Sequence, residues 1–362
     1  MRVAIIHYWL VGMRGGERVL EQLCRLFPDA DIFTHVLNRE RISDAILRHK
    51  IQCTTVSRLP FALTQYKKYL VFMPKALEEL NLAGYDLVIS SEAGPSKGVI
   101  PPPNSKHITY CHSPMRYIWD QYHQYKLELG WPARQIFSHV AHNLRQWDVT
   151  AASRVDKFVA NSNFVAARIA RYYGRDAEVL NPPVDLDAYR PIASPSQSYY
   201  FMISELVPYK RADLAVEAFR GLDKQLVIAG SGSEFKRLKS IAPPNVRFVG
   251  RASNSELREL YSNAAALIFP GEEDFGIVPL EAMACGRPVL AYGSGGVLET
   301  VVDGKTGLFF HEQTAAALRQ TILDFESKVA NFEPRIIRAR AEQFSETRFR
   351  DRFASIVAKT LT

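Results

Sequence analysis

Short apolar runs alternate with amphipathic stretches along the first half of the chain. The apolar runs have continuous hydrophobic cores rather than strict alternation, which is typical of a parallel sheet covered on both faces. They span residues 3–7, 31–36, 86–90, 107–111, 157–161 and 178–180. Helical periodicity between them is clearest at 17–27, 132–153 and 164–173. This alternation predicts a doubly wound α/β domain.

A stretch rich in proline and serine interrupts this pattern at residues 181–185 and 191–198, and we interpret it as a linker. A second series of predicted strands follows, at 199–203, 225–229, 246–249, 265–269 and 288–291. The tail from 334 to 361 has a helical pattern throughout. Two similar α/β halves joined by one linker predict a cleft between them.

The composition excludes several classes of protein. The 362 residues are 47% hydrophobic and 23% charged, which is ordinary for a soluble protein and excludes disordered, collagen-like and coiled-coil chains. With no run of 18 apolar residues and no signal-peptide pattern, we expect a cytoplasmic protein. The four cysteines form no Cys-x-x-Cys pair, so we expect small buried side chains rather than disulfides or a zinc site.

The net charge of +7 is unevenly placed, because no Asp or Glu occurs in residues 45–77. This segment mixes lysines and arginines with aromatic residues, which suits peripheral contact with an anionic membrane. A solvated basic face whose aromatic residues belong to the core is an equal alternative. No nucleic-acid-binding motif accompanies the segment, so we expect no nucleic-acid partner.

Candidate chemistry in the first half follows two predicted strands, since ligands of open α/β sheets bind at the carboxyl ends of strands. Gly15 and Gly16 precede the helix at 17–27, where glycines let the backbone approach a phosphate, although a plain tight turn is as good an explanation. His112 directly follows strand 107–111. A histidine there faces the crevice, but a structural hydrogen-bonding role is the alternative.

The second half carries a stronger pattern. Lys210 and Arg211 follow a strand and open a helix, and such a pair of cations suits a diphosphate. Gly230 repeats the strand–glycine–helix arrangement. Acidic residues before the next helix could simply cap it. However, the spacing of Glu273 and Glu281 directs two carboxylates toward one cleft, which is the arrangement that a nucleotide-sugar requires.

Together these motifs resemble glycosyltransferase family 4, whose members are retaining enzymes with the GT-B fold: two Rossmann-like domains facing each other across a cleft. The resemblance rests on Gly15-Gly16, His112-Ser113-Pro114, Asn161-Ser162, residues 181–185, Lys210-Arg211, residues 230–232 and Glu273-x7-Glu281. It implies an acceptor-side domain at 1–185 and a donor domain at 186–342. It also implies a terminal helix, 343–362, that packs back on the first domain.

The resemblance also implies roles for individual residues. His112 would lie beside the transferred sugar, Glu273 would hold the sugar's hydroxyls, and Glu281 would bind the ribose. Lys210 and Arg211 would neutralise the diphosphate without a metal ion or any other cofactor. The implied catalytic residues are His112, Lys210, Arg211 and Glu273. Donor contacts are implied for Gly15, Gly16, Glu205, Lys210, Arg211, Gly230, Phe275, Gly276, Ile277 and Glu281.

Residues 110–120 and 206–211 are similar to bacterial O-antigen and exopolysaccharide mannosyltransferases. The similarity implies GDP-mannose as donor and a lipid-linked oligosaccharide as acceptor, at the inner face of the cytoplasmic membrane, in lipopolysaccharide or exopolysaccharide synthesis. Alternatives are another GT-B activity, such as a sugar-nucleotide epimerase, and a catalytically silent nucleotide-binding partner. Glu205 replaces the arginine of most members. Either Lys210 and Arg211 suffice to bind the diphosphate, or the side chain of Glu205 points away from it.

Overall fold

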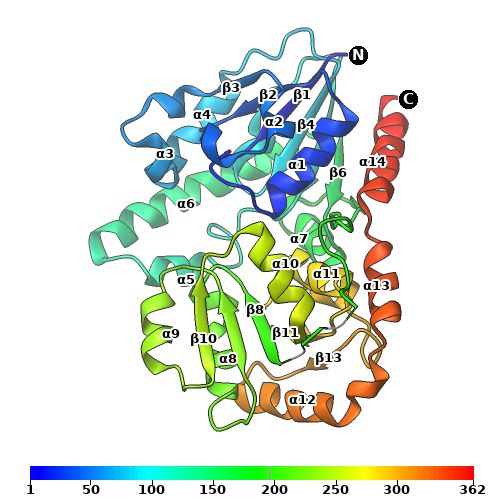
Figure 1. The fold of residues 1–362 in the computed structure, drawn as a ribbon. Coiled ribbons are helices and arrows are strands. Elements are labelled where there is room, and N and C mark those ends of the chain that lie inside the picture. Colours follow the sequence, from blue (N-terminus) through cyan, green and yellow to red (C-terminus); the bar gives the residue numbers. More distant parts are fainter. Residues whose placement is uncertain (194, 197) are drawn as a thin grey trace. The chain divides into compact units, whose positions relative to one another are not determined.

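The computed structural model describes residues 1–193, 195, 196 and 198–362 (Figure 1). The chain folds into two compact units: unit 1 contains residues 1–182 and 349–362, and unit 2 contains residues 183–348. Near the start of unit 2, the amide of Val184 donates to the carbonyl of Phe344, 2.9 Å away. The predicted linker at 191–198 includes Ser194 and Gln197, which lie outside the described residues.

Unit 1 is built on a parallel seven-stranded sheet in the order β3-β2-β1-β4-β5-β6-β7. The strands are β1 (Val3–His7), β2 (Asp31–Thr34), β3 (Ile51–Cys53), β4 (Leu87–Glu92), β5 (Lys106–Cys111), β6 (Lys157–Ala160) and β7 (Ala177–Val179). The strand order reverses between β1 and β4, and such a switch point is where open α/β sheets bind ligands.

Successive residues of β1 are buried on opposite faces of this sheet. Ile5 packs in one core with Leu20 of α1 (Gly15–Leu26), whereas Ile6 packs in another with Leu77 of α4 (Met73–Glu78). A strand with apolar residues on both faces needs cover on both sides, so the expected doubly wound arrangement is confirmed. The helices are α1 (Gly15–Leu26), α2 (Asp44–Leu47), α3 (Ala62–Gln65), α4 (Met73–Glu78), α5 (Tyr122–Leu127), α6 (Trp131–Ala152) and α7 (Asn163–Tyr173).

In unit 1 one strand was missed and one expectation was wrong. The edge strand β3 was not predicted, because it is short and mostly exposed and so lacks an apolar run. Cys53 on this strand is exposed rather than buried, unlike the other three cysteines.

Unit 2 has a parallel six-stranded sheet in the order β10-β9-β8-β11-β12-β13. The strands are β8 (Tyr199–Ile203), β9 (Leu226–Ala229), β10 (Val246–Gly250), β11 (Ala264–Phe269), β12 (Val289–Tyr292) and β13 (Gly307–Phe310). Its helices are α8 (Ala212–Ala218), α9 (Phe235–Ile241), α10 (Asn254–Asn263), α11 (Ile277–Ala284), α12 (Ala315–Lys328) and α13 (Pro334–Glu342). Here the order reverses between β8 and β11.

The tail is not one continuous helix, contrary to the prediction from its pattern. It divides into α13 and α14 (Glu346–Leu361), separated by a bend at which Phe344 and Ser345 pair with the backbone of Val184. From Phe349 onward α14 belongs to unit 1, where Phe349 and Phe353 are buried in the same core as Ile5.

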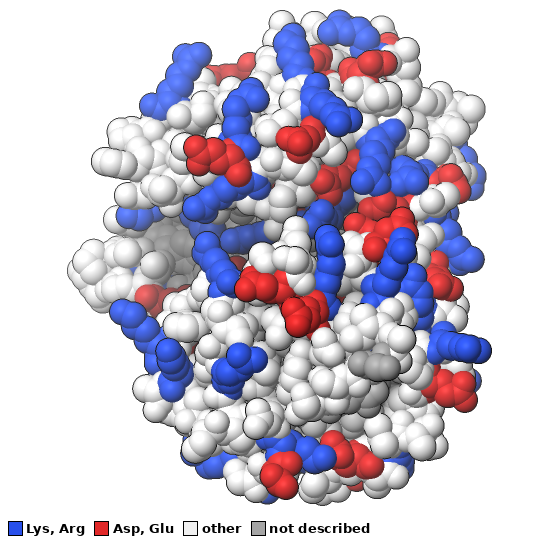
Figure 2. Space-filling view, in the orientation of Figure 1, with Lys and Arg blue, Asp and Glu red and all other residues white. Residues whose placement is uncertain are grey.

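Charged side chains of both signs are interspersed over the face shown in Figure 2. The left edge of this view, where Figure 1 places one end of α6, is mostly free of them. No helix among the described residues is long and apolar enough to cross a membrane.

Candidate active site

In unit 2, the loops after β8 and β9 lie against each other. The amide of Ser204 donates to Ala229, and that of Leu206 donates to the carbonyl of Ser231, 3.0 Å away. Gly230 makes this contact possible, because a Cβ there would lie 1.9 Å from the carbonyl oxygen of Ser204. Its φ of +130° is also a conformation that other residues rarely adopt. Gly230 therefore brings the two loops together.

We expect Gly230→Ala to destabilise unit 2 by more than about 2 kcal/mol, since a positive φ alone costs roughly 1–2 kcal/mol and the collision adds to it. Gly250→Ala is the matched control, because Gly250 also has a positive φ but nothing lies within 4 Å of its built Cβ. Urea unfolding followed by circular dichroism measures both. Equal losses in the two variants would show that the contact with Ser204 does not constrain position 230.

Lys210, at the end of the loop after β8, contacts Glu273 in the loop after β11. Its Nζ lies 2.6 Å from Oε1 of Glu273, and the two side chains are 15% and 23% exposed. Burial lowers the pKa of Lys210, but Glu273, Tyr209 and Asp274 together raise it above its ordinary value. Lys210 therefore stays cationic at neutral pH. The structure brings these two predicted site residues together.

The loop that carries Glu273 is held by its own backbone. The Glu273 carbonyl accepts from the amide of Gly296 at 2.9 Å, and the neighbouring Glu272 carboxylate accepts from the Ser294 hydroxyl at 2.6 Å. Gly276 then turns the chain with a φ of +86°, and α11 begins at Ile277. The N-terminal end of a helix carries a partial positive charge. Only Asp274, Phe275 and Gly276 thus separate Glu273 from the helix N-terminus at Ile277.

Arg211 is turned toward other partners. Its guanidinium donates to both carboxylate oxygens of Asp213, at 3.2 and 3.3 Å, and to Gln313 at 3.0 Å. Asp213 therefore offsets part of its charge, whereas Lys210 is the cation placed against Glu273. The side chain of Glu205 is exposed.

Glu281, on α11, is anchored by a residue that the sequence patterns did not reveal. Its Oε2 accepts a hydrogen bond from the hydroxyl of Tyr261, 2.6 Å away on α10. Burial, together with the negative charge of Glu281, raises the pKa of Tyr261 well above its ordinary value. Tyr261 thus remains a proton donor that orients the carboxylate.

In unit 1, the predicted glycine turn contacts a tyrosine. Gly15 and Gly16 open α1, and a Cβ on Gly16 would lie 2.1 Å from the hydroxyl oxygen of Tyr8. Within unit 1, the close approach to Gly16 is thus made by Tyr8, which directly follows β1 and is 7% exposed. A side chain at position 16 would therefore require Tyr8 to shift.

His112 directly follows β5, and its ring forms a hydrogen bond with a side chain of β4. Its Nε2 lies 2.9 Å from the hydroxyl oxygen of Ser91, which is also 3.0 Å from Nδ1 of His7. Burial, and the nearby His7, lower the pKa of His112 to about 3. The ring is therefore neutral at neutral pH. His7 and Ser91 were missed, although both lie at carboxyl ends of strands.

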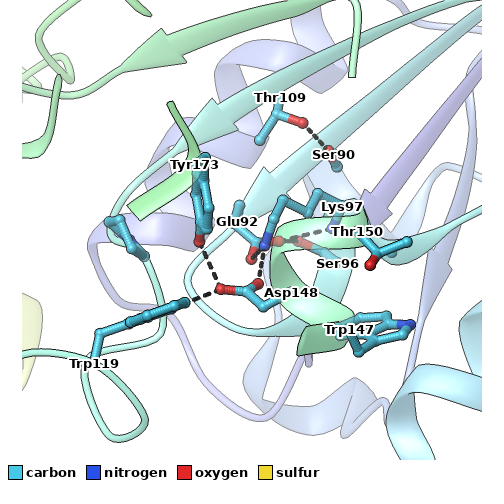
Figure 3. Close-up of polar contacts among 12 residues, drawn as sticks. Ser90, Glu92, Ser96, Lys97, Thr109, Trp119, Trp147, Asp148, Thr150 and Tyr173 are labelled. Carbon is cyan, nitrogen blue, oxygen red and sulfur yellow. Dashed lines mark hydrogen bonds and ion pairs between the residues drawn. The ribbon is translucent and has the colours of Figure 1, made fainter. Parts of the chain in front are cut away.

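A fully buried ion cluster in unit 1 includes Glu92, the last residue of β4 (Figure 3). Lys97 contacts both Glu92 and Asp148, and all three side chains are 0% exposed. Trp119 and Tyr173 donate to the second oxygen of Asp148, at 2.8 and 2.9 Å. The backbone carbonyl of Glu92 accepts from the amide of His112 at 2.7 Å. The cluster thus holds the strand end on which His112 depends.

Among the residues that the structure describes, no group of three or more His, Cys, Asp or Glu side chains is gathered as a metal ion would need. An open groove of about 480 Å³ lies beside β10 and α10, where Arg247, Arg251 and Glu256 line it. None of the predicted site residues lines this groove.

Comparison with known proteins places the chain in a family. Residues 13–188 match the family model described as "Glycosyltransferase Family 4", and residues 190–343 match "Glycosyl transferases group 1". The fold is similar to that of Anabaena HepE in complex with UDP and glucose, with a TM-score of 0.72, 16% identity and 99% of both chains covered.

Two curated relatives are similar in sequence. An uncharacterized glycosyltransferase of Methanocaldococcus jannaschii is 27% identical over 178 residues, which is 47% of this chain and 48% of the relative. The GDP-mannose-dependent alpha-(1-6)-phosphatidylinositol monomannoside mannosyltransferase of Mycobacterium tuberculosis is 30% identical over 204 residues, 47% of this chain and 53% of the relative. The similarity thus spans about half the length of these relatives. With its two Rossmann-like units and two family-model matches, the chain belongs to glycosyltransferase family 4, whose fold is GT-B.

Proposed function

We propose that the chain is a retaining glycosyltransferase that transfers mannose from GDP-mannose to a lipid-linked oligosaccharide. The observation that carries the proposal is the contact between Lys210 and Glu273 beside the N-terminus of α11. A cation suits a diphosphate, a carboxylate suits sugar hydroxyls, and a nucleotide-sugar presents both groups side by side. The relative from M. tuberculosis is GDP-mannose-dependent, which supports this choice of donor.

In the proposed reaction, the acceptor hydroxyl attacks the anomeric carbon of the sugar. A bond forms between the acceptor oxygen and that carbon, and the bond to the diphosphate breaks on the same face. The departing diphosphate takes up the proton of the acceptor hydroxyl. Lys210 and the amides at the start of α11 stabilise the negative charge that develops on the departing diphosphate. Glu273 holds the sugar, Glu281 holds the ribose, and His112 lies beside the transferred sugar.

The test is incubation of the full chain with GDP-mannose, UDP-glucose or UDP-N-acetylglucosamine, each with and without a lipid-linked oligosaccharide. We expect GDP release from GDP-mannose that depends on the acceptor. Absence of nucleotide release from every donor would overturn the proposal. Consumption of UDP-N-acetylglucosamine without acceptor would favour an epimerase. Tight nucleotide binding without turnover would favour a silent partner, for which the exposed Glu205 in place of arginine is the supporting feature.

We further propose that unit 1 contacts an anionic membrane through residues 45–77. Part of this segment belongs to the core, since Tyr66 is only 7% exposed. Phe61 and Phe72, however, are 76% and 56% exposed and flank the exposed Lys67 and Lys68. Exposed aromatic residues beside lysines are suited to the interface of a bilayer. Such contact would bring the enzyme to a lipid-linked acceptor.

Charge reversal tests the membrane contact. We expect Lys67→Glu/Lys68→Glu to weaken co-sedimentation with phosphatidylglycerol vesicles by about 30-fold or more, because each basic residue contributes about 1 kcal/mol near an anionic surface. Lys236→Glu/Lys239→Glu, on exposed positions of α9 in unit 2, makes the same change in charge and should retain binding. Failure of the unmodified chain to bind such vesicles even at low salt would contradict the proposal.

A further inference from the structure

His112 stands at one end of a chain of side chains that runs back to α1. The hydroxyl oxygen of Ser91 lies between Nε2 of His112 and Nδ1 of His7, at 2.9 and 3.0 Å. On its far side, Nε2 of His7 lies 3.6 Å from Oε1 of Glu17. The side chains of His7 and Glu17 are 0% and 1% exposed, and Ser91 is buried. Water therefore does not compete for these contacts.

The single proton of the Ser91 hydroxyl couples the two histidines. A hydroxyl that contacts two ring nitrogens can donate to one and accept from the other. If Ser91 donates to His7, it accepts from an Nε2–H of His112. If it donates to His112, the proton of neutral His7 is on Nδ1, and the bare Nε2 of His7 faces Glu17. The tautomer of one ring therefore sets that of the other.

Glu17 selects between these two arrangements. Its Oε2 already accepts from the backbone amide of Arg14 at 2.9 Å, which holds the carboxylate at the start of α1. A bare nitrogen next to this carboxylate would place two acceptors against each other in a buried position, which is costly. The Glu17 carboxylate, 3.6 Å away, thus favours a proton on Nε2 of His7. In that arrangement Ser91 donates to Nδ1 of His7, and Nε2 of His112 donates to Ser91.

We propose that Glu17, His7 and Ser91 are positioning residues that hold His112 in the tautomer protonated on Nε2, so that its Nδ1 accepts a hydrogen bond from a substrate hydroxyl. The depressed pKa of His112 is consistent with this, because a neutral ring keeps one nitrogen free of a proton. The role toward substrate rests on the proposed function, whereas the tautomer itself does not.

Glu17→Gln is the decisive variant because it preserves shape and removes the charge. The amide oxygen of the new side chain can still accept from Arg14, and its NH₂ group then faces His7. That group favours a bare Nε2 on His7, reverses the Ser91 hydroxyl, and moves the proton of His112 to Nδ1. Glu21→Gln is the matched control, since Glu21 is a 7% exposed carboxylate on the same helix that pairs with Arg18 instead.

The primary readout is the long-range ¹H–¹⁵N spectrum of the full chain labelled at histidine, at about pH 8, where a histidine of ordinary pKa is neutral. The His112 signals are assigned by their loss in His112→Gln. We expect the Nε2–H pattern in the unmodified chain and in Glu21→Gln, and the Nδ1–H pattern in Glu17→Gln. An unchanged His112 pattern in Glu17→Gln would overturn the proposal.

Activity provides the second readout. We expect kcat of Glu17→Gln to fall by about tenfold or more while the donor KM stays within about threefold, because the ring is present but its acceptor nitrogen is blocked. Equal kcat in Glu17→Gln and Glu21→Gln, despite a switched tautomer, would contradict the substrate contact. Absence of turnover in the unmodified chain would instead count against the proposed function, and the spectrum would still decide the tautomer.

Discussion

Replacing Lys97 with methionine is expected to lower the free energy of unfolding of unit 1 by about 3–5 kcal/mol, the usual result of removing one partner from a buried ion pair. Methionine fills a similar volume but leaves Glu92 and Asp148 buried together without a cation (Figure 3). Tyr173 and Trp119 still donate to Asp148, but neutral donors do not offset two negative charges. The loss should therefore exceed that of an ordinary surface substitution.

The decrease in the free energy of unfolding caused by Lys97→Met should also depend on pH. Burial raises the pKa of Glu92, while Lys97 lowers it and Asp148 raises it further. Without Lys97 the pKa of Glu92 rises more, so protonation relieves the repulsion as the pH falls. The destabilisation is thus largest above neutral pH and smaller at about pH 5. In the unmodified chain the pKa of Lys97 is raised, so its stabilisation is complete below the ordinary lysine pKa and is lost only when the pH rises above that value.

Tryptophan fluorescence during urea unfolding measures this loss for unit 1 alone, because all four tryptophans, at positions 9, 119, 131 and 147, lie in unit 1. Lys75→Met is the control, since Lys75 is 84% exposed and contacts Glu79 at 3.5 Å, and its effect should stay within about 0.5 kcal/mol. If Lys97→Met lost no more stability than Lys75→Met, the buried cluster would not be a structural determinant.

Lys210→Ala is expected to reduce kcat/KM for the nucleotide-sugar by about 100-fold while the chain remains folded. A charge-assisted hydrogen bond contributes about 1.5–3 kcal/mol, and removal of a group that stabilises developing charge commonly costs 10²–10³ in rate. Glu273→Ala should cause a loss of similar size, because Glu273 is the partner of Lys210 at 2.6 Å. Steady-state nucleotide release with a saturating acceptor measures both variants.

Lys239→Ala is the control for these variants, because Lys239 is an exposed lysine of α9 in the same unit. It should retain full turnover, and circular dichroism should show that all three variants are folded. Arg211→Ala should have a smaller effect than Lys210→Ala, since Asp213 already offsets part of the charge of Arg211. Full activity in a folded Lys210→Ala or Glu273→Ala variant would show that the site is misassigned.

Much of the architecture could be predicted because it depends on local pattern. Continuous apolar runs identified β1 and β8, since strands covered on both faces must be hydrophobic at successive positions. The two-domain α/β fold is confirmed by the two parallel sheets. The edge strand β3 escaped prediction because it is too short and too exposed to form an apolar run. The bend at Phe344 escaped prediction because it does not interrupt the helical pattern of the tail.

Parts of the site escaped prediction for a different reason. Lys210 and Glu273 could be proposed because each follows a strand in a run of turn-forming residues. Periodicity indicates which face of a helix is buried, however, and not which distant residue it meets. Lys97 and Asp148 are 51 positions apart, and Arg211 and Gln313 are 102 apart. Likewise, nothing local indicates that Ser91 bridges two histidines. Such pairs require the folded chain.

Calorimetric titration of the full chain with GDP and with GMP tests the central claim most directly. If Lys210 and the start of α11 hold a diphosphate, GDP should bind at least about tenfold more tightly than GMP, since one charge-assisted hydrogen bond contributes about 1.5–3 kcal/mol. This preference should disappear in Lys210→Ala. Equal affinity for GDP and GMP in the unmodified chain, or a preference that persists in Lys210→Ala, would contradict the account.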